Sequence, residues 1–302
     1  MMDDLHLLPK LRDSLSYLYI EHAVIERDKS ALLVLQQTGR TLLPIANLCL
    51  LLLGPGTSLT HAAVVLLAQN GTSVVWAGED ANKFYAQGNG ETRRAAHLLK
   101  QAELVCDPHA RLEVVMRMYE MRFGYPLEAG LSLEQIRGKE GARVRNAYAE
   151  ASRKFGVKWQ GRKYDRSNWA NADPVNRALS AANALLNGIC HAAIVSGGYS
   201  PGLGFLHTRL HLSFVYDIAD LYKTEFTIPA AFYTAAQGSE KIEKRTRETC
   251  RELFRQEKLL RRILPDIDRL LHIEDRNEYN VLDEDLSLPV DWWQPGEIVP
   301  GE

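Results

Sequence analysis

The first 87 residues alternate short apolar runs with turn residues. The runs are YLYIEHAVIE, ALLVLQQ, TLLPI, NLCLLLL, VVWAG and KFYAQ, and RDKS, TG and EDAN separate them. β-Branched and aromatic residues are enriched in these runs, which predicts an antiparallel sheet system over residues 1–87. One helix is predicted inside it, through SLTHAAVVLLAQ, with Thr57 or Ser58 as its N-cap and Asn70 and Gly71 as its stop.

After a predicted hinge, GNGE at 88–91, the periodicity becomes helical. Segments such as ETRRAAHLLKQAELVC, DPVNRALSAANALLNGICHAAIVSGG and FVYDIADLYKTEF continue it to about residue 271. The pattern predicts an α+β chain, in which the β domain precedes an all-α domain over 92–282. Residues 283–302 are acidic, contain two adjacent tryptophans and three prolines, and lack any basic residue, so we expect a tail ordered by a partner.

Composition narrows the class of protein. The chain has 302 residues, 46% hydrophobic and 25% charged, which is typical of a globular protein and excludes general disorder. Its first residues, MMDDLHLLPKLRDS, are acidic where a signal peptide is basic, and the strongest apolar run, LCLLLL, is far shorter than the roughly 20 residues that span a bilayer. We therefore expect a cytoplasmic protein. The four cysteines form no CxxC pair, so we expect buried thiols rather than a disulfide framework or a zinc site.

The formal net charge of −2 conceals a segregation of charge. Residues 84–282 hold 30 basic and 24 acidic groups, and 21 of the basic groups are arginines, whose planar fork binds phosphate through two hydrogen bonds. Within this region, 137–166 contains ten basic and three acidic residues. The aromatic residues Trp159, Tyr164 and Trp169 are interleaved there, as in proteins that bind single strands, although such clusters can also be packing. A polyanionic partner is predicted.

A first candidate for chemistry is Glu140. Ser132 and Gln135 form a predicted capping box, so a helix should begin near Leu133. Its apolar stripe then passes through Ile136, and Glu140 occupies the next position of that stripe. An unpaired buried carboxylate is too costly to persist, so Glu140 must meet a cation, either an arginine or a metal.

A second candidate is the spacing of Asp217, Asp220 and Lys223, three residues apart in a segment that is otherwise apolar. On one helix over 214–223 these side chains would share a side. Together with His207 and Glu140 they supply oxygen ligands and one imidazole, a set suited to Mg²⁺ or Mn²⁺. A divalent ion among arginines favours phosphodiester chemistry, with either water or a DNA 3′-hydroxyl as the nucleophile. The alternative for the aspartates and Lys223 is a surface ion pair.

Four motifs resemble one known family in order and spacing. LLGPGTSLTHAAV, VVWAGE, QIRGKEGARVRNAY and GFLHTRLHLSFVYDIADLYK are similar to segments of the CRISPR-associated integrase that inserts new spacers, in the subtype that accompanies Cascade (type I-E). The similarity extends from about residue 10 to about residue 276. It implies an N-terminal β-sandwich, a C-terminal helical catalytic domain, a homodimer, and a heterohexamer of two such dimers with a small dimeric partner of ferredoxin-like fold.

The resemblance also implies roles for particular residues. Glu140, His207 and Asp220 would bind Mg²⁺ or Mn²⁺, with Asp217 as an auxiliary acid and Lys223 as an active-site base or phosphate contact. A prespacer 3′-hydroxyl would attack the CRISPR repeat, and branched DNA would be cut. By position, the DNA contacts would be Lys83, Arg111, Arg137, Tyr164, Arg245 and His22, and the tail would clasp the small partner. The chain departs from a well-known form of the family at His22, Ser58 and Asn187, where that form has tyrosine, arginine and tyrosine.

Two other functions stay open at this point. A structure-selective, metal-dependent nuclease would use the same residues without joining strands. A catalytically silent DNA-bridging scaffold would use Glu140 and the aspartates only as partners of arginines, and would show no metal-dependent change in melting.

Overall fold

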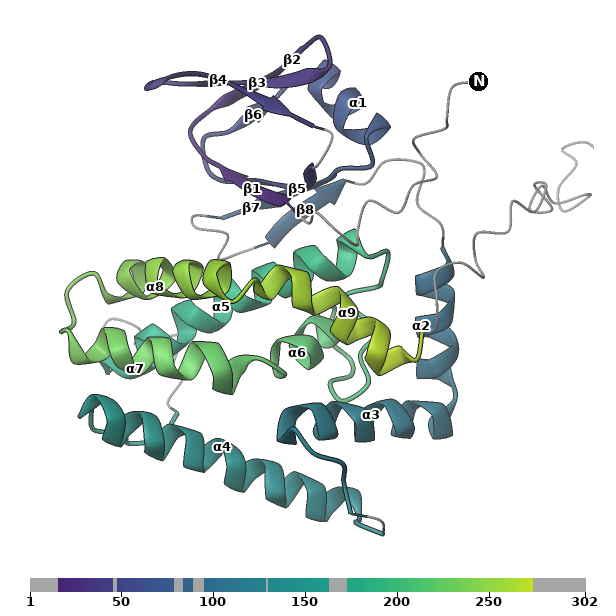
Figure 1. Cartoon of the computed structure of the whole chain (residues 1–302), viewed down its shortest axis with the longest axis vertical. Helices are drawn as coiled ribbons and strands as arrows, with labels where there is room; N and C mark the ends of the chain where they lie inside the picture. The colour runs from purple at the N-terminus through teal and green to yellow at the C-terminus, as the bar shows by residue number, and fades with distance from the viewer. Residues whose placement is uncertain are drawn as a thin grey trace, which may run out of the picture.

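The computed structural model describes residues 16–45, 48–78, 84–88, 95–128, 130–162 and 173–273. A β region lies above a larger layered helical region (Figure 1). This order confirms the predicted fold class, a β-sandwich followed by helices. Lys83, Tyr164, Trp169, most of the predicted hinge and the acidic tail lie outside the described residues.

The β region consists of two four-stranded sheets. The first sheet has the order β1-β5-β7-β8, and the second has the order β4-β3-β2-β6. The strands are β1 (Ser16–Ile20), β2 (Val24–Asp28), β3 (Ala31–Gln36), β4 (Gly39–Pro44), β5 (Leu48–Leu53), β6 (Ser58–Leu59), β7 (Ser73–Ala77) and β8 (Phe84–Gly88). The expectation of antiparallel sheets is wrong for part of this region, because β1 pairs β5 and β5 pairs β7 in parallel. The second of these connections passes through β6 and α1, as parallel strands require a crossover.

The apolar run YLYIEHAVIE is two strands rather than one. It contributes β1 to the first sheet and β2 to the second, and the chain turns between them at His22, whose φ is 51°. The amide of His22 donates to the carbonyl of Pro55 at 2.9 Å, which ties this corner to the GPGT turn. The hydrophobic pattern alone did not show the corner, because apolar residues stand on both sides of it, at 17–20 and 23–25.

Helix α1 (His61–Gln69) lies beside the second sheet and ends as predicted. Asn70 is its C-cap, and Gly71 follows with a φ of 63°. Its N-cap is Thr60, not Thr57 or Ser58, because Thr60 Oγ1 accepts from the amide of Ala63 at 3.4 Å. The two expected residues are used elsewhere: Thr57 Oγ1 donates to the carbonyl of Ile20, and Ser58 belongs to β6.

The helical region follows the predicted order. Its elements are α2 (Ala96–Cys106), α3 (Pro108–Phe123), α4 (Leu133–Phe155), α5 (Pro174–Ser196), α6 (Ser213–Ala219), the π-helix η3 (Lys223–Thr227), α7 (Ile228–Ala236), α8 (Ile242–Gln256) and α9 (Leu259–Leu271). The start of α4 at Leu133 and its capping box between Ser132 and Gln135 are confirmed. Buried Cys190 and Cys250 match the expectation for the cysteines, whereas Cys106 is exposed.

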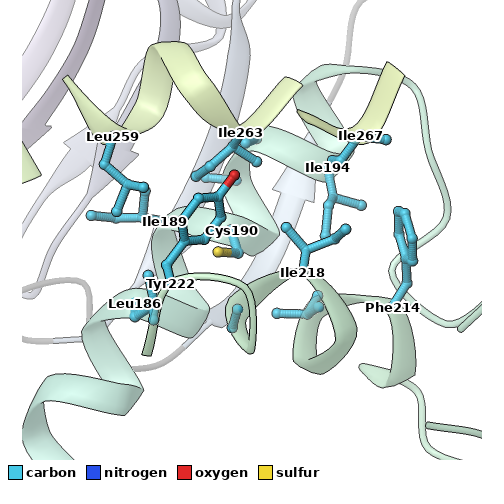
Figure 2. Close-up of a cluster of buried hydrophobic side chains, with 14 of the residues drawn as sticks. Leu186, Ile189, Cys190, Ile194, Phe214, Ile218, Tyr222, Leu259, Ile263 and Ile267 are labelled. Carbon is cyan, nitrogen blue, oxygen red and sulfur yellow. The ribbon is translucent and has the colours of Figure 1, made fainter. Parts of the chain in front are cut away.

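Helix α5 is the centre of this region, because α6, α7, α8 and α9 all pack against it. Figure 2 shows Leu259, Ile263 and Ile267 of α9 facing Ile189 and Ile194 of α5, with Phe214, Ile218 and Tyr222 beside them. By length and composition α5 could cross a membrane, but most of its apolar stretch is buried inside the protein. Such burial is typical of a core helix.

One predicted helix is broken in the structure. The segment 214–226 forms α6, a turn at 220–222 and then η3. Pro229, in the first turn of α7, lacks the amide that would bond to the carbonyl of Glu225 in a continuous α-helix, which favours a change of register here. Asp217 therefore lies inside α6 and Asp220 caps its end, so the expectation of one continuous helix is wrong. Lys223 nevertheless contacts Asp220, and the charges of all three residues act on His207.

The sandwich and the helices share a hydrophobic core. Leu50 and Leu52 of β5 and Val75 and Ala77 of β7 belong to the same buried cluster as residues of α5. The opposite residues of these strands, such as Leu51 and Val74, lie in a second cluster between the two sheets. The first sheet therefore buries both of its faces, one within the sandwich and one against α5.

Candidate active site

Helix α4 presents Glu140 to the helical region. Its side chain is 15% exposed, and it accepts two hydrogen bonds from Arg143, at 2.8 and 3.1 Å. Arg122 of α3 approaches from the other side, with its Nη1 3.6 Å from Glu140 Oε1. The inward-facing carboxylate thus meets two arginines, and Arg143 also donates to Thr224 of η3 at 3.0 Å.

Asp217 organises the loop that carries His207. Its side chain is 0% exposed, and Oδ2 accepts from the amides of Phe205 and Leu206 at 2.6 and 3.1 Å. Its Oδ1 accepts from the amide of His207 at 2.9 Å and lies 2.7 Å from His207 Nδ1. Because an ionised carboxylate only accepts, Nδ1 carries the proton and Nε2 is left with its lone pair.

Asp220 lies where α6 meets η3. Its Oδ1 is 2.5 Å from Lys223 Nζ, and its Oδ2 is 3.4 Å from Arg122 Nη2. The side chain is 21% exposed. Arg122 therefore contacts both Asp220 and Glu140, so these two carboxylates, from α6 and α4, face each other across one guanidinium group.

His207 is close to the same charges. Its pKa is raised above the ordinary value, mainly by the hydrogen bond to Asp217, while burial opposes the shift. The charges of Asp220 and Lys223 also act on the imidazole, with opposite signs. The His207 side chain is 41% exposed, so the imidazole lies at the surface of the protein.

The loop before His207 is fixed from α2 and α3. Gln101 is fully buried and makes three hydrogen bonds to it: it accepts from the Ser200 amide at 2.7 Å and donates to the Ser200 and Leu203 carbonyls at 3.0 and 2.9 Å. Arg111 donates twice to the Phe205 carbonyl, at 3.0 and 2.8 Å. A Cβ on Gly204 would lie 2.3 Å from the His207 carbonyl oxygen, so the backbone passes too closely there for a side chain.

The donor set suits a divalent metal, although the carboxylates now contact cations. Two carboxylates, from Glu140 and Asp220, and one imidazole nitrogen form a donor set that suits Mg²⁺ or Mn²⁺, and a third carboxylate, that of Asp217, holds the imidazole from behind. Among the residues that the structure describes, no three His, Cys, Asp or Glu side chains are grouped closely enough to hold an ion. The residues fit the metal by chemistry, and Arg122 lies between the two carboxylates.

Comparison with known proteins decides the family. The model of the family described as CRISPR associated protein Cas1 matches residues 16–124 and 124–269. The chain belongs to the Cas1 family. The resemblance found in the sequence is thereby confirmed.

Two curated Cas1 relatives extend over nearly the whole chain. CRISPR-associated endonuclease Cas1 2 of Thermus thermophilus is 54% identical over 296 residues, which cover 97% of this chain and 91% of the relative. CRISPR-associated endonuclease Cas1 of Escherichia coli is 42% identical over 262 residues, 86% of each chain. A crystal structure of a TtCas1–DNA complex superposes with a TM-score of 0.78 at 57% identity, covering 87% of this chain and 99% of that one. These relationships place the chain among the Cas1 endonucleases.

The residues predicted to contact DNA lie in different settings in this Cas1 chain. His22 and Arg137 are exposed. Arg111 is engaged with the Phe205 carbonyl, and Arg245 donates to the carbonyls of Glu240 and Gly238 after α7. Trp159 stacks on Tyr148 with ring centroids 4.5 Å apart, so it contributes to packing between α4 and the segment that follows it.

Sequence reasoning missed three side chains of this site. Arg143 lies three residues after Glu140, and helical spacing could have identified it. Arg122 and Gln101 come from α3 and α2, far away in sequence, and only the packing of those helices brings them here. No local pattern marks either residue.

Proposed function

We propose that this chain is a divalent-metal-dependent DNA integrase and endonuclease of CRISPR adaptation. It would join prespacer 3′-hydroxyl ends to the CRISPR repeat by transesterification and would also cut branched DNA. One observation carries the proposal: buried Asp217 lies 2.7 Å from His207 Nδ1, which turns Nε2 outward, while Arg122 contacts both Glu140 and Asp220.

Glu140, Asp220 and His207 Nε2 would hold Mg²⁺ or Mn²⁺, and Asp217 would keep the imidazole in the ligating tautomer. When bound, the ion would polarise a phosphoryl oxygen and activate the attacking hydroxyl. Lys223 and Arg143 are cations at the same site, and their charge would stabilise the developing charge on the phosphate.

The strand-transfer reaction needs no external energy source, because it exchanges one phosphodiester bond for another. The prespacer 3′-oxygen loses its proton and forms a bond to a phosphorus of the repeat strand. The bond from that phosphorus to its former 3′-oxygen breaks, and that oxygen takes up a proton. One phosphodiester replaces another, so the same groups could direct water to phosphorus in the nuclease reaction.

The partners follow from the same proposal. We infer that the substrates are a prespacer duplex with 3′ overhangs and repeat DNA, both of which suit the arginine-rich region 137–166. A homodimer would cover the exposed apolar side chains Val24 and Leu42 on the outer face of the second sheet. Two such dimers would assemble with the small dimeric ferredoxin-like partner, and the protein would act in the cytoplasm.

The test is a strand-transfer assay with the full chain and its small partner. A duplex with a defined 3′ end is incubated with a supercoiled plasmid that carries a repeat array, in Mg²⁺ or Mn²⁺. We expect label to become covalently joined to the plasmid, and we expect EDTA or a 3′-deoxy end to abolish this. Asp220→Ala and His207→Ala should each abolish transfer while DNA binding stays nearly intact.

A matched control is Glu103→Gln, which removes an exposed carboxylate paired with Lys100 on α2, at 2.9 Å, and should leave transfer unchanged. Transfer at the wild-type rate by either site variant would refute the site assignment. Metal-dependent nicking without transfer would indicate a plain nuclease, and DNA binding without either would indicate a scaffold.

A further inference from the structure

Arg122 is the most buried cation of the site and the one with the longest contacts. Its side chain is 6% exposed, and its Nη atoms lie 3.6 Å from Glu140 Oε1 and 3.4 Å from Asp220 Oδ2. Its Nε is buried without a hydrogen-bond partner among the described residues. The guanidinium stacks over the ring of Tyr119, 5.6 Å from the centroid. A buried arginine with an unpaired nitrogen is costly, so its position needs an explanation.

Other arginines of the same protein close on their carboxylates. Arg143 binds Glu140 at 2.8 and 3.1 Å, and Arg177 binds Glu243 at 2.7 and 2.9 Å. These distances are typical of charge-assisted hydrogen bonds, whereas those of Arg122 exceed them. Arg122 is therefore held between two carboxylates and is bonded tightly to neither.

The two carboxylates that Arg122 contacts already have more cations than they need. Glu140 and Asp220 are opposed by Arg122, Arg143 and Lys223. A divalent cation that enters this set adds two positive charges next to three others, and that repulsion is strong away from bulk water. The resident cation with the weakest bonds is the one that can give up its contacts at the smallest cost. That cation is Arg122.

We propose that Arg122 is an internal counter-ion that occupies the space between Glu140 and Asp220 and competes with the divalent metal for them. It keeps the facing carboxylates from repelling each other before the metal arrives, and it lowers the affinity of the site for that metal. The inference rests on the proposed function, because it assumes that Glu140 and Asp220 bind the metal.

The experiment compares Mn²⁺ binding by the metal-free full chain and by Arg122→Met. Methionine keeps an unbranched apolar side chain against Tyr119 but removes the charge. Titration calorimetry should show that the variant binds Mn²⁺ about tenfold or more tightly, because one competing positive charge is gone. The melting temperature without metal should fall, and the rise on adding Mn²⁺ should exceed that of the wild type.

Two further variants separate charge from stability. Arg122→Lys keeps the positive charge, so its Mn²⁺ affinity should stay near that of the wild type. Arg177→Met breaks a tight ion pair between α5 and α8, away from the site, and should lower the melting temperature without changing Mn²⁺ affinity. If Arg122→Met does not fold, Arg122→Gln provides the same removal of charge with a polar side chain.

Equal or weaker Mn²⁺ binding by the folded, uncharged variant would overturn the inference while leaving the metal site intact. Tighter binding by Arg122→Lys as well would also overturn it, because the charge would then not be the cause. If neither the wild type nor any Arg122 variant binds Mn²⁺, the metal site of the proposed function fails, and the inference fails with it.

Discussion

The loop that carries His207 and the carboxylate pair formed by Glu140 and Asp220 are held differently. In the loop, Asp217 accepts four hydrogen bonds of 2.6 to 3.1 Å, and Gln101 makes three more to the loop backbone. The carboxylates of Glu140 and Asp220 share one guanidinium at 3.6 and 3.4 Å, in addition to their closer partners Arg143 and Lys223. The neutral ligand is fixed in advance by hydrogen bonds that need not change, whereas the charged ligands keep contacts that a metal can replace.

Asp217→Asn should have the largest effect on stability. At the Oδ2 position the amide nitrogen would face two backbone amides, and at the Oδ1 position it would face the His207 amide and force Nδ1 to give up its proton. We expect a loss of about 3–4 kcal/mol in the free energy of unfolding, measured by guanidinium chloride denaturation in EDTA. A loss below about 1 kcal/mol would show that the loop does not depend on this carboxylate.

Lowering the pH should have the next largest effect on the free energy of unfolding, through His191. Burial, together with the charge of His211 in the loop after His207, lowers the pKa of His191 on α5 to about 4. The unfolded chain therefore binds a proton near pH 6.5 while the folded protein resists it, so stability is complete above that pH and falls as the pH drops toward 4. We expect a loss of roughly 2 kcal/mol between pH 7 and 5.

Denaturation curves at the two pH values measure this loss. His191→Asn should flatten the difference between them, because it removes the titrating group. An unchanged pH dependence in that variant would assign the acid sensitivity to other groups.

Gln101→Leu should have an effect of similar size. Leucine fills the same buried space but loses three hydrogen bonds to the backbone of Ser200 and Leu203, so we expect about 2 kcal/mol of destabilisation. Mn²⁺ affinity should also fall, because His207 would be less well positioned. The control is Gln256→Leu, which loses an exposed contact with Glu252 and should leave both quantities nearly unchanged. If Gln101→Leu kept the Mn²⁺ affinity of the wild type, the support that Gln101 gives to the loop would not be needed for metal binding.

Asp220→Asn should have the smallest effect on folding, within about 1 kcal/mol, although it should abolish strand transfer. The amide can still accept from Lys223, and Arg122 keeps its contact with Glu140. The same denaturation in EDTA compares it directly with Asp217→Asn. Equal losses in the free energy of unfolding for the two substitutions would contradict the proposed difference between the His207 loop and the Glu140–Asp220 pair.

Helix boundaries and the side of a helix on which a residue lies could be predicted from the sequence, because they depend on neighbouring residues. The capping box placed the start of α4 at Leu133, and the apolar stripe placed Glu140 inward. The helix expected over 214–223 failed because a π-helix and Pro229 change the register after Asp220. Arg122 and Gln101 could not be predicted, because their contacts depend on how α3 and α2 pack against segments about 100 residues later.

The shared core beneath the first sheet has a consequence for how the protein can be divided. The lower face of that sheet, with Leu52 and Val75, is covered by α5 and not by water. A fragment containing only the sandwich would expose that face, and a fragment containing only the helices would expose the surface of α5 that matches it. We therefore expect the two architectural parts to unfold together, and a cut where the strands give way to helices should not yield two stable pieces.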